Sequence, residues 1–218
     1  MPDWYCSCTP TVLPGVRQKS CTVSLEQSGC RNSKVTLPFA SVTRATTSSV
    51  PPPGGFVITN AASGRTDVRG LVYTAAYVPD ADETINSLGV GYVPGAFLDH
   101  LVLAPSLPFV LVDPQFFPED FAQDLNPKLG AEIAAQQLPT SLLLFGTPSG
   151  PGAWHTLPSW YAVSAHDRAI DPDLQRFMAQ RAGSTTVQFS AASHVGGLTH
   201  YKARFVKLIE QAAAATAG

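Results

Sequence analysis

Residues 158–183 read PSWYAVSAHDRAIDPDLQRFMAQRAG, and this stretch decides the fold class. The run from Ser159 to Ser164 is apolar and unbroken, which is typical of a strand buried on both faces of a parallel sheet. A helix opens at Asp171, Pro172 and Asp173, with an N-cap acid, a first-turn proline and negative charge at the positive end of the helix dipole. A buried strand followed by a capped helix predicts an α/β domain.

Further elements of the same kind extend from Gly54 to the end of the chain. Leu174, Phe177 and Met178 are spaced to share one face of the helix that follows Asp171. The other expected elements are a helix start at 54–62, strands at 68–77 and 185–190, helices opening near 116 and over 131–137, and a last helix over about 201–215. These elements predict one parallel sheet with flanking helices.

Residues 1–53 follow a different pattern. They are rich in Ser, Thr, Pro and Cys, and they show neither a helical nor a strand periodicity. Three prolines at 51–53 would interrupt any helix or strand interior. We therefore predict an aberrant, poorly ordered segment at 1–53 and a domain at 54–218, with a helical insertion at about 85–150 in the position of a lid.

Composition excludes several classes of function. The 218 residues carry a net charge of −2, which gives no electrostatic basis for binding nucleic acid or an acidic membrane. No apolar run approaches the roughly 18–20 residues that span a bilayer, and the first residues do not resemble a signal peptide, so we expect a cytoplasmic protein. The cysteines lack the spacing of metal knuckles or of a secreted disulfide framework, and we expect no metal and no cofactor. The four cysteines are Cys6, Cys8, Cys21 and Cys30.

An acid and a histidine follow two neighbouring strands. Asp167 comes just after the strand at 159–164, and His194 comes just after the strand at 185–190. Ligands of open α/β sheets bind at the carboxyl ends of the strands, and a histidine acting as a general base needs a carboxylate to hold its tautomer. We therefore expect Asp167 and His194 to form a catalytic pair. The competing histidines are His100, His155, His166 and His200.

Aromatic residues are frequent in the insertion. Phe97, Phe109, Phe116 and Phe117 could line a ligand pocket, or they could simply pack the insertion onto the sheet. The sequence leaves both interpretations open.

The stretch at 158–183, followed by S-H-V at 193–195, resembles the C-terminal part of the α/β-hydrolase superfamily. It is most similar to small bacterial esterases related to hydroxynitrile lyases and plant methyl esterases. The stretch GGFVITNAASGRTDVRGLVYTAAYVPD at 54–80 also resembles this group, in which it directly follows the nucleophile elbow. The resemblance covers about three quarters of the chain. It implies the order Ser, Asp, His for the catalytic triad, with Asp167 and His194 as its last two members.

The nucleophile motif of that family is missing. Its elbow reads G-x-S-x-G-G, and aligning the last two glycines with Gly54 and Gly55 places Pro52 at the serine position. Pro53 would follow, and proline lacks the N–H that the oxyanion hole needs at this position. Ser48 and Ser49 lie before the prolines and not on an elbow. The nucleophile is therefore unknown.

A shifted reading frame would account for both the odd composition and the missing motif. Triplets that take the third base of one codon and the first two of the next can read Leu-Val-Leu-Leu-Val over residues 3–8, as a first hydrolase strand would. The same offset over 45–52 can read Asp-Asp-Leu-Val-Gly-x-Ser, the approach to an elbow. We hypothesise that residues 1–53 are an out-of-frame translation.

The resemblance implies a carboxylic ester hydrolase that uses a Ser-His-Asp mechanism, impaired in this chain because no nucleophile is recognisable. The expected partner is a small ester or a similar apolar ligand. Two alternatives stay open: a homologue that binds a small ligand without turnover, and an enzyme similar to hydroxynitrile lyase.

Overall fold

The computed structural model describes residues 54–105 and 107–217, and before them the backbone of four short strands. The chain divides into two compact units, Met1–Ala40 and Ser41–Gly218. Apart from those four strands, the segment that we expected to be poorly ordered, with its prolines, lies outside the described residues.

The four short strands form two antiparallel pairs within the first unit. Strand β1 (Cys6–Ser7) pairs with β4 (Thr22–Val23), and β2 (Thr11–Leu13) pairs with β3 (Val16–Gln18).

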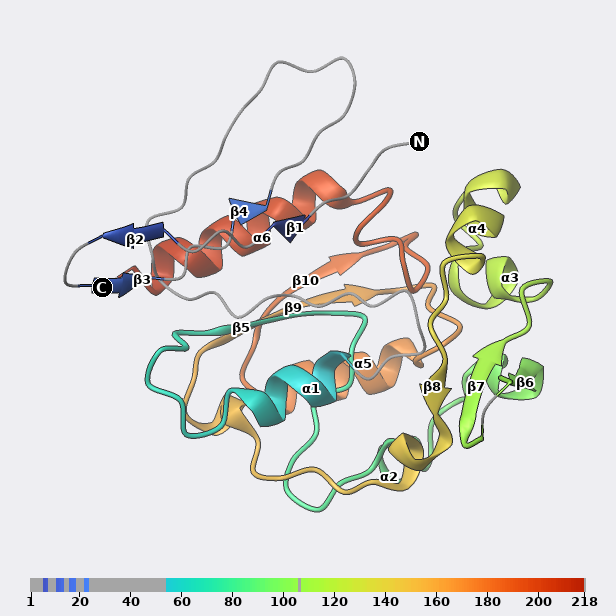
Figure 1. The fold of residues 1–218 in the computed structure, drawn as a ribbon, viewed down its shortest axis with the longest axis horizontal. Helices are drawn as coiled ribbons and strands as arrows, with labels where there is room; N and C mark the ends of the chain where they lie inside the picture. The colour runs from blue at the N-terminus through green and yellow to red at the C-terminus, as the bar shows by residue number, and fades with distance from the viewer. Residues whose placement is uncertain are drawn as a thin grey trace, which may run out of the picture. The chain divides into compact units, whose positions relative to one another are not determined.

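The second unit is built on a parallel sheet with the order β10-β9-β5 (Figure 1). The strands are β5 (Leu71–Thr74), β9 (Ser159–Ser164) and β10 (Thr185–Phe189). All six residues of β9 are buried, because β9 lies between the other two strands and is covered on both faces. The unbroken apolar run thus forms the central strand.

Helices cover both faces of this sheet. On one face, α1 (Gly54–Ala61) and α5 (Pro172–Arg181) pack in the core cluster that contains Tyr73 and Tyr161. On the other face, α6 (Lys202–Ala215) packs on Val72, Trp160 and Ala162 through Phe205, Leu208 and Ala212 (Figure 1). Successive strand residues point to opposite faces, so the same three strands supply both cores. These layers confirm the predicted α/β architecture.

Two local predictions differ from the structure. The strand expected over 68–77 is limited to β5, because Ala75 adopts a positive φ of 43° that turns the chain out of the sheet. Phe177, expected on the buried face of α5, is 43% exposed, and the buried position is instead taken by Gln175.

The insertion between β5 and β9 contains strands as well as helices. An antiparallel sheet of order β6-β7-β8 lies beside the helices. The helix expected over 131–137 begins earlier, because Asn126 caps its first turn. The insertion runs through α2 (Ile85–Leu88), η1 (Ala96–His100), β6 (Leu101–Leu103), β7 (Phe109–Val112), α3 (Phe117–Phe121), α4 (Pro127–Ala134), β8 (Thr140–Ser141), η2 (Leu142–Gly146) and η3 (Ala153–His155).

Helix α1 approaches the backbone beyond β5 so closely that only glycine fits at Gly55. A Cβ at this position would lie 1.8 Å from the carbonyl oxygen of Tyr77. The sequence predicted a helix start whose glycines permit a close approach, and the structure confirms it.

We predict that Gly55→Ala destabilises the fold by at least about 2 kcal/mol, because the methyl group would force α1 away from Tyr77. The matched control is Gly146→Ala, since nothing lies within 4 Å of a Cβ at Gly146. Urea unfolding of both variants measures the difference. Equal unfolding midpoints would show that α1 moves at no cost.

An ion pair between Glu83 and Arg181 connects the start of the insertion to α5. Arg181 donates to both carboxylate oxygens of Glu83, at 2.6 and 2.8 Å, and to the carbonyl of Val78 at 2.9 Å. Its guanidinium also lies over the rings of Trp154 and Phe177. Partial burial opposes the charged form of Glu83, but the hydrogen bonds from Arg181 and from the Asp80 backbone outweigh it and hold the pKa of Glu83 below its usual value.

Because the folded pKa of Glu83 is lowered, its contribution to stability is present above its unfolded pKa of about 4.3 and is lost as the pH falls through the folded value. We expect Arg181→Met to cost about 1–2 kcal/mol at neutral pH and to weaken the loss of stability in acid. Unfolding in urea at several pH values tests this. Arg176→Met, which breaks the exposed pair of Arg176 with Asp173 on the same helix, is the control.

Candidate active site

The structure brings Asp167 and His194 together at the carboxyl ends of β9 and β10. Nδ1 of His194 donates to Oδ2 of Asp167 at 2.9 Å. The Asp167 side chain is fully buried and that of His194 is 11% exposed. Strands β9 and β10 are parallel neighbours in register, so the loops that follow them meet at one edge of the sheet.

Every oxygen of the Asp167 carboxylate is satisfied. Oδ1 accepts from the backbone N–H groups of Ala169 at 2.7 Å and Ile170 at 3.0 Å, and Oδ2 accepts from Nε2 of Gln175 at 2.7 Å as well as from His194. These four hydrogen bonds fix the carboxylate in place. Its charge also acts on two neighbouring phenols: burial, and then the nearby Asp167 carboxylate, raise the pKa of Tyr77. Burial likewise raises the pKa of Tyr161; the hydrogen bond to the Ala76 backbone opposes this rise and the Asp167 carboxylate adds to it.

The insertion holds His194 from the other side. The ring of Phe121, at the end of α3, meets the imidazole edge-on at 5.1 Å between centroids. The backbone N–H of Val195 donates to the carbonyl of Phe121 at 3.1 Å. The position of the imidazole therefore depends on α3 as well as on Asp167.

Two other histidines also pair with carboxylates in the part of the chain that the structure describes. His100 bonds Asp120 at 2.8 Å, and His155 bonds Asp80 at 2.9 Å, but both imidazoles are more exposed than that of His194. No carboxylate partner is seen for the side chains of His166 and His200 among the described residues. Of the described pairs, only His194 and Asp167 follow adjacent strands of the central sheet.

Gln175 is the site residue that sequence reasoning missed. It is fully buried, and besides Asp167 it donates to the carbonyl of Ile170 at 2.9 Å and accepts from the N–H of Ser164 at 3.0 Å. The available signal was its place among Leu174, Met178 and Ala179, the other buried residues of α5. A polar residue in that position needs partners, and the aspartate before the helix is an obvious one.

We expect Gln175→Leu to destabilise the fold by about 2–4 kcal/mol, because it leaves the Ser164 N–H and the Ile170 carbonyl without their Gln175 partner and removes one of the two donors to Oδ2 of Asp167. Gln180→Leu, at an exposed position of the same helix, should change stability by less than about 0.5 kcal/mol. Thermal and urea unfolding of the two variants compare the costs. A Gln175→Leu variant as stable as the parent would remove Gln175 from the support of the site.

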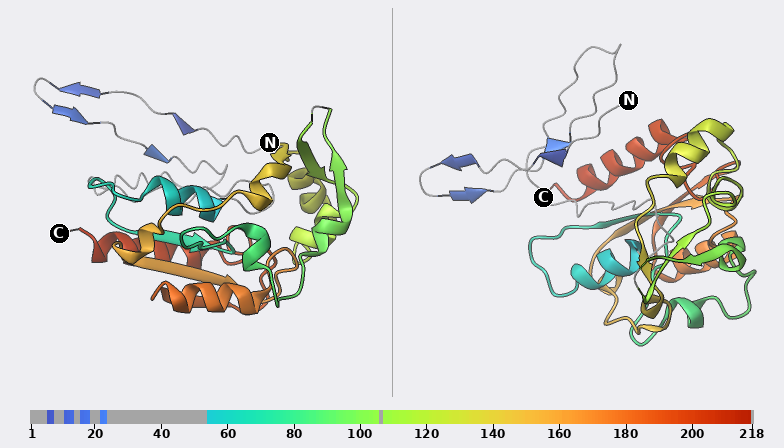
Figure 2. Two further views of the ribbon diagram at one scale, coloured as in Figure 1. Left: turned by 90° about the horizontal axis from the view of Figure 1, so that it is seen from below. Right: turned by 45° about the vertical axis from the view of Figure 1, so that its right-hand side comes forward.

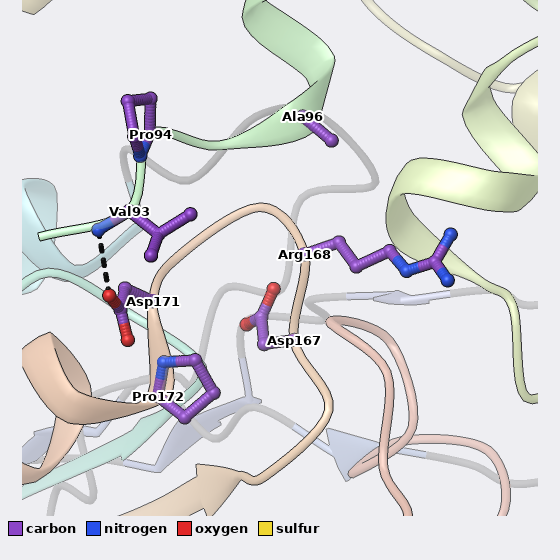
Figure 3. A pocket seen from close by; sticks show the side chains of 7 residues that line it. All are labelled: Val93, Pro94, Ala96, Asp167, Arg168, Asp171 and Pro172. Carbon is purple, nitrogen blue, oxygen red and sulfur yellow. Dashed lines mark hydrogen bonds between the residues drawn. The ribbon is translucent and has the colours of Figure 1, made fainter.

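A pocket of about 250 Å³ lies beside the loop that carries Asp167 (Figure 3). Asp171, which caps α5, also accepts from the N–H of Val93 at 2.8 Å and so ties the two walls together. His194 does not line the pocket, which therefore offers a ligand no contact with the imidazole. The lining residues are Val93, Pro94, Ala96, Asp167, Arg168, Asp171 and Pro172.

The aromatic residues of the insertion do not line this pocket. Phe97 and Phe117 are buried and pack on Phe121, which supports the interpretation that they hold the insertion in place. Phe109 and Phe116 are more than a third exposed.

Within the described residues, no hydroxyl group is hydrogen-bonded to Nε2 of His194. The positions that the elbow alignment singles out, Pro52 and Pro53, lie outside those residues, as do Ser48 and Ser49. Several buried oxygens near the carboxyl ends of the strands have no hydrogen-bond partner among the described residues, although buried polar groups are nearly always paired. They are Oγ1 of Thr74, both carboxylate oxygens of Asp124, and Oγ of Ser164 and Ser193.

No three His, Cys, Asp or Glu side chains within 54–105 and 107–217 are grouped as metal ligands would be. None of the helices described is long and apolar enough to cross a bilayer.

Comparison with known proteins gives the family. The sequence model of the Alpha/beta hydrolase family matches residues 54–208, well over half of the chain. The chain belongs to the alpha/beta hydrolase family. The match begins at Gly54, the residue at which the sequence pattern changes. The comparison with curated proteins gives no match.

Solved structures of this alpha/beta hydrolase fold are similar to the chain. A pyrethroid hydrolase, PytH, is 23% identical, with 76% of this chain and 69% of that chain covered and a TM-score of 0.60. Polyneuridine aldehyde esterase is 16% identical, with coverage of 73% and 68% and a TM-score of 0.58. Methylketone synthase I from tomato, complexed with 2-tridecanone, is 14% identical, with coverage of 74% and 68% and a TM-score of 0.54. At these identities the likeness shows the fold alone.

Proposed function

We propose that this alpha/beta hydrolase carries the base half of a carboxylic ester hydrolase site, with His194 as the general base and Asp167 as the carboxylate that orients it. The observation that carries the proposal is the buried hydrogen bond between them, at 2.9 Å. The Asp167 carboxylate also accepts hydrogen bonds from the backbone N–H groups of Ala169 and Ile170 and from the amide of Gln175. A pyrethroid hydrolase and an esterase among the similar structures support ester chemistry.

The hydrogen bond between the two residues supports a separate role for each of them. When Nδ1 of His194 donates to Asp167, Nε2 is left as an acceptor, which can take a proton from an attacking hydroxyl and later return it to the leaving alcohol. Asp167 stabilises the imidazolium that forms in between. The nucleophile and the oxyanion donor would come from the segment before Gly54, where Pro52 can supply no hydroxyl and Pro53 no N–H.

The chain as it stands should therefore turn over esters slowly or not at all. We attribute the lost elbow to a shifted reading frame over residues 1–53. The oxygens of Thr74, Ser164 and Ser193 that lack a partner among the described residues support this proposal. Thr74 and Ser164 end β5 and β9, and Ser193 precedes His194, so all three lie where a properly formed elbow would bring polar backbone groups.

Sequencing the coding DNA across residues 45–55 tests the origin of the segment. The expected result is a frame in which G-x-S-x leads into Gly54 and Gly55, the last two glycines of the elbow. An in-frame product that still lacks a serine elbow would exclude the shifted frame.

Activity tests the roles of the pair. The frame-restored protein should hydrolyse p-nitrophenyl butyrate, and His194→Ala should lower kcat/KM about a thousandfold or more, since the base is lost. His155→Ala, which removes the exposed histidine paired with Asp80, is the matched control and should leave the rate unchanged. In the unrestored chain, ester turnover that disappears in His194→Ala would contradict the predicted loss of activity.

Binding without turnover is the second candidate function. It is favoured by the absence of a hydroxyl bonded to Nε2 of His194 among the described residues, and by the apolar ketone bound in the tomato methylketone synthase. Saturable binding of 2-tridecanone by a chain that hydrolyses no ester would select this candidate. Cleavage of mandelonitrile would instead select the activity of hydroxynitrile lyases.

A further inference from the structure

The insertion exposes a group of apolar side chains at one end of its small sheet. We call this group the apolar tip, and it consists of Leu103, Leu107, Phe109, Leu142 and Leu143. Leu103, Leu107 and Leu143 are 68%, 73% and 69% exposed, and the other two are more than a third exposed. The N–H of Leu142 donates to the carbonyl of Pro108 at 2.9 Å, which joins the β6–β7 turn to the start of η2. Exposed apolar groups of this kind mark interaction surfaces.

The apolar tip is free of charge. No Asp, Glu, Lys, Arg or His occurs from Leu101 to Val112, or from Ala134 to Trp154. The nearest charged residues before and after the hairpin, Asp99 and Asp113, are acidic. An uncharged surface with acidic flanks matches a neutral apolar phase and would be repelled by an anionic one.

The apolar tip is connected to the candidate active site. At the base of the β6–β7 hairpin, the N–H of Asp113 donates to the carbonyl of His100 at 2.8 Å, and the ring of His100 bonds Asp120 on α3. The next residue of α3 is Phe121, which packs on the His194 imidazole. Figure 2 shows the β6–β7 hairpin, in green, at the margin of the unit next to α3. The hairpin thus links the apolar tip, at its turn, to α3, at its base, and α3 is the element that holds His194.

We propose that the apolar tip adsorbs to a neutral lipid–water interface, so that the esters acted on at His194 are water-insoluble molecules taken from that interface. The choice of substrate class rests on the proposed function, but the adsorption does not. The composition argues against a second copy of the chain as the occupant. The residues that carry most of the binding energy of protein interfaces are Trp, Tyr and Arg, with leucine under-represented, and neither 101–112 nor 134–153 contains a Trp, Tyr or Arg. Adsorption is distinct from spanning the bilayer, which no described helix could do.

Flotation of the full chain with vesicles tests the proposal without any turnover. The chain should bind vesicles of phosphatidylcholine, should bind no better when phosphatidylserine is added, and should not be released by salt. The double variant Leu107→Glu with Leu143→Glu should lower the partition coefficient at least about tenfold, because two exposed leucines can no longer enter the apolar phase. Val57→Glu with Val206→Glu, on exposed positions of α1 and α6, is the control and should stay within about twofold of the parent.

Three results would overturn the proposal: no flotation of the parent chain, equal flotation of the double variant and the parent, or a concentration-dependent dimer that the double variant abolishes. Because the substituted leucines are exposed, the variant should unfold at the same temperature as the parent, which separates a lost surface from a lost fold. An inactive chain that still floats would uphold adsorption and leave the chemistry at His194 to its own test.

Discussion

The structure around the candidate site depends on one buried carboxylate. Burying a charge is costly unless donors surround it, and Asp167 meets this requirement through two backbone N–H groups, the amide of Gln175 and the imidazole of His194. These donors come from the turn after β9, from α5 and from the loop after β10. The same contacts that stabilise the carboxylate therefore bind three separate elements to each other, and the aspartate has a structural role as well as its proposed chemical one.

Much of this arrangement could be predicted from local pattern. The apolar run of β9 and the capped start of α5 follow from residue order alone, and the meeting of Asp167 with His194 follows from the rule that parallel strands end at one edge. Phe177 was expected on the buried face of α5 and Gln175 was not considered, because helical spacing locates a face but does not say where that face ends. The groups around the helix decide where its buried face ends. Gln175 is buried because it donates to the Asp167 carboxylate, and Phe177 lies at the surface, where the Arg181 guanidinium stacks on its ring.

The insertion was harder to predict for a different reason. Its strands are two to four residues long, too short to display an alternation of buried and exposed residues. In addition, β7 pairs with β8, and these two strands are separated in the sequence by α3 and α4. The start of α4 carried a local signal, Asn126 before Pro127, which the helix expected over 131–137 did not use. The nucleophile could not be placed at all, because no pattern in residues 1–53 offers an elbow and the described residues supply no hydroxyl to Nε2 of His194.

Loop-closure entropy favours one order of assembly for the central sheet. Thr185 pairs with Trp160 a short distance along the chain, whereas Leu71 pairs with Ser159 only after the whole insertion has been enclosed. Closing a small loop costs less entropy than closing a large one, so β9 and β10 with the intervening helix α5 can form first, as a nucleus onto which β5 adds later. The loops that carry Asp167 and His194 both belong to this early part. A polypeptide altered before Gly54 could thus still bring Asp167 and His194 together, because the two strands that carry them pair directly with each other across α5. The contact of Phe121 with the imidazole is added when the insertion folds.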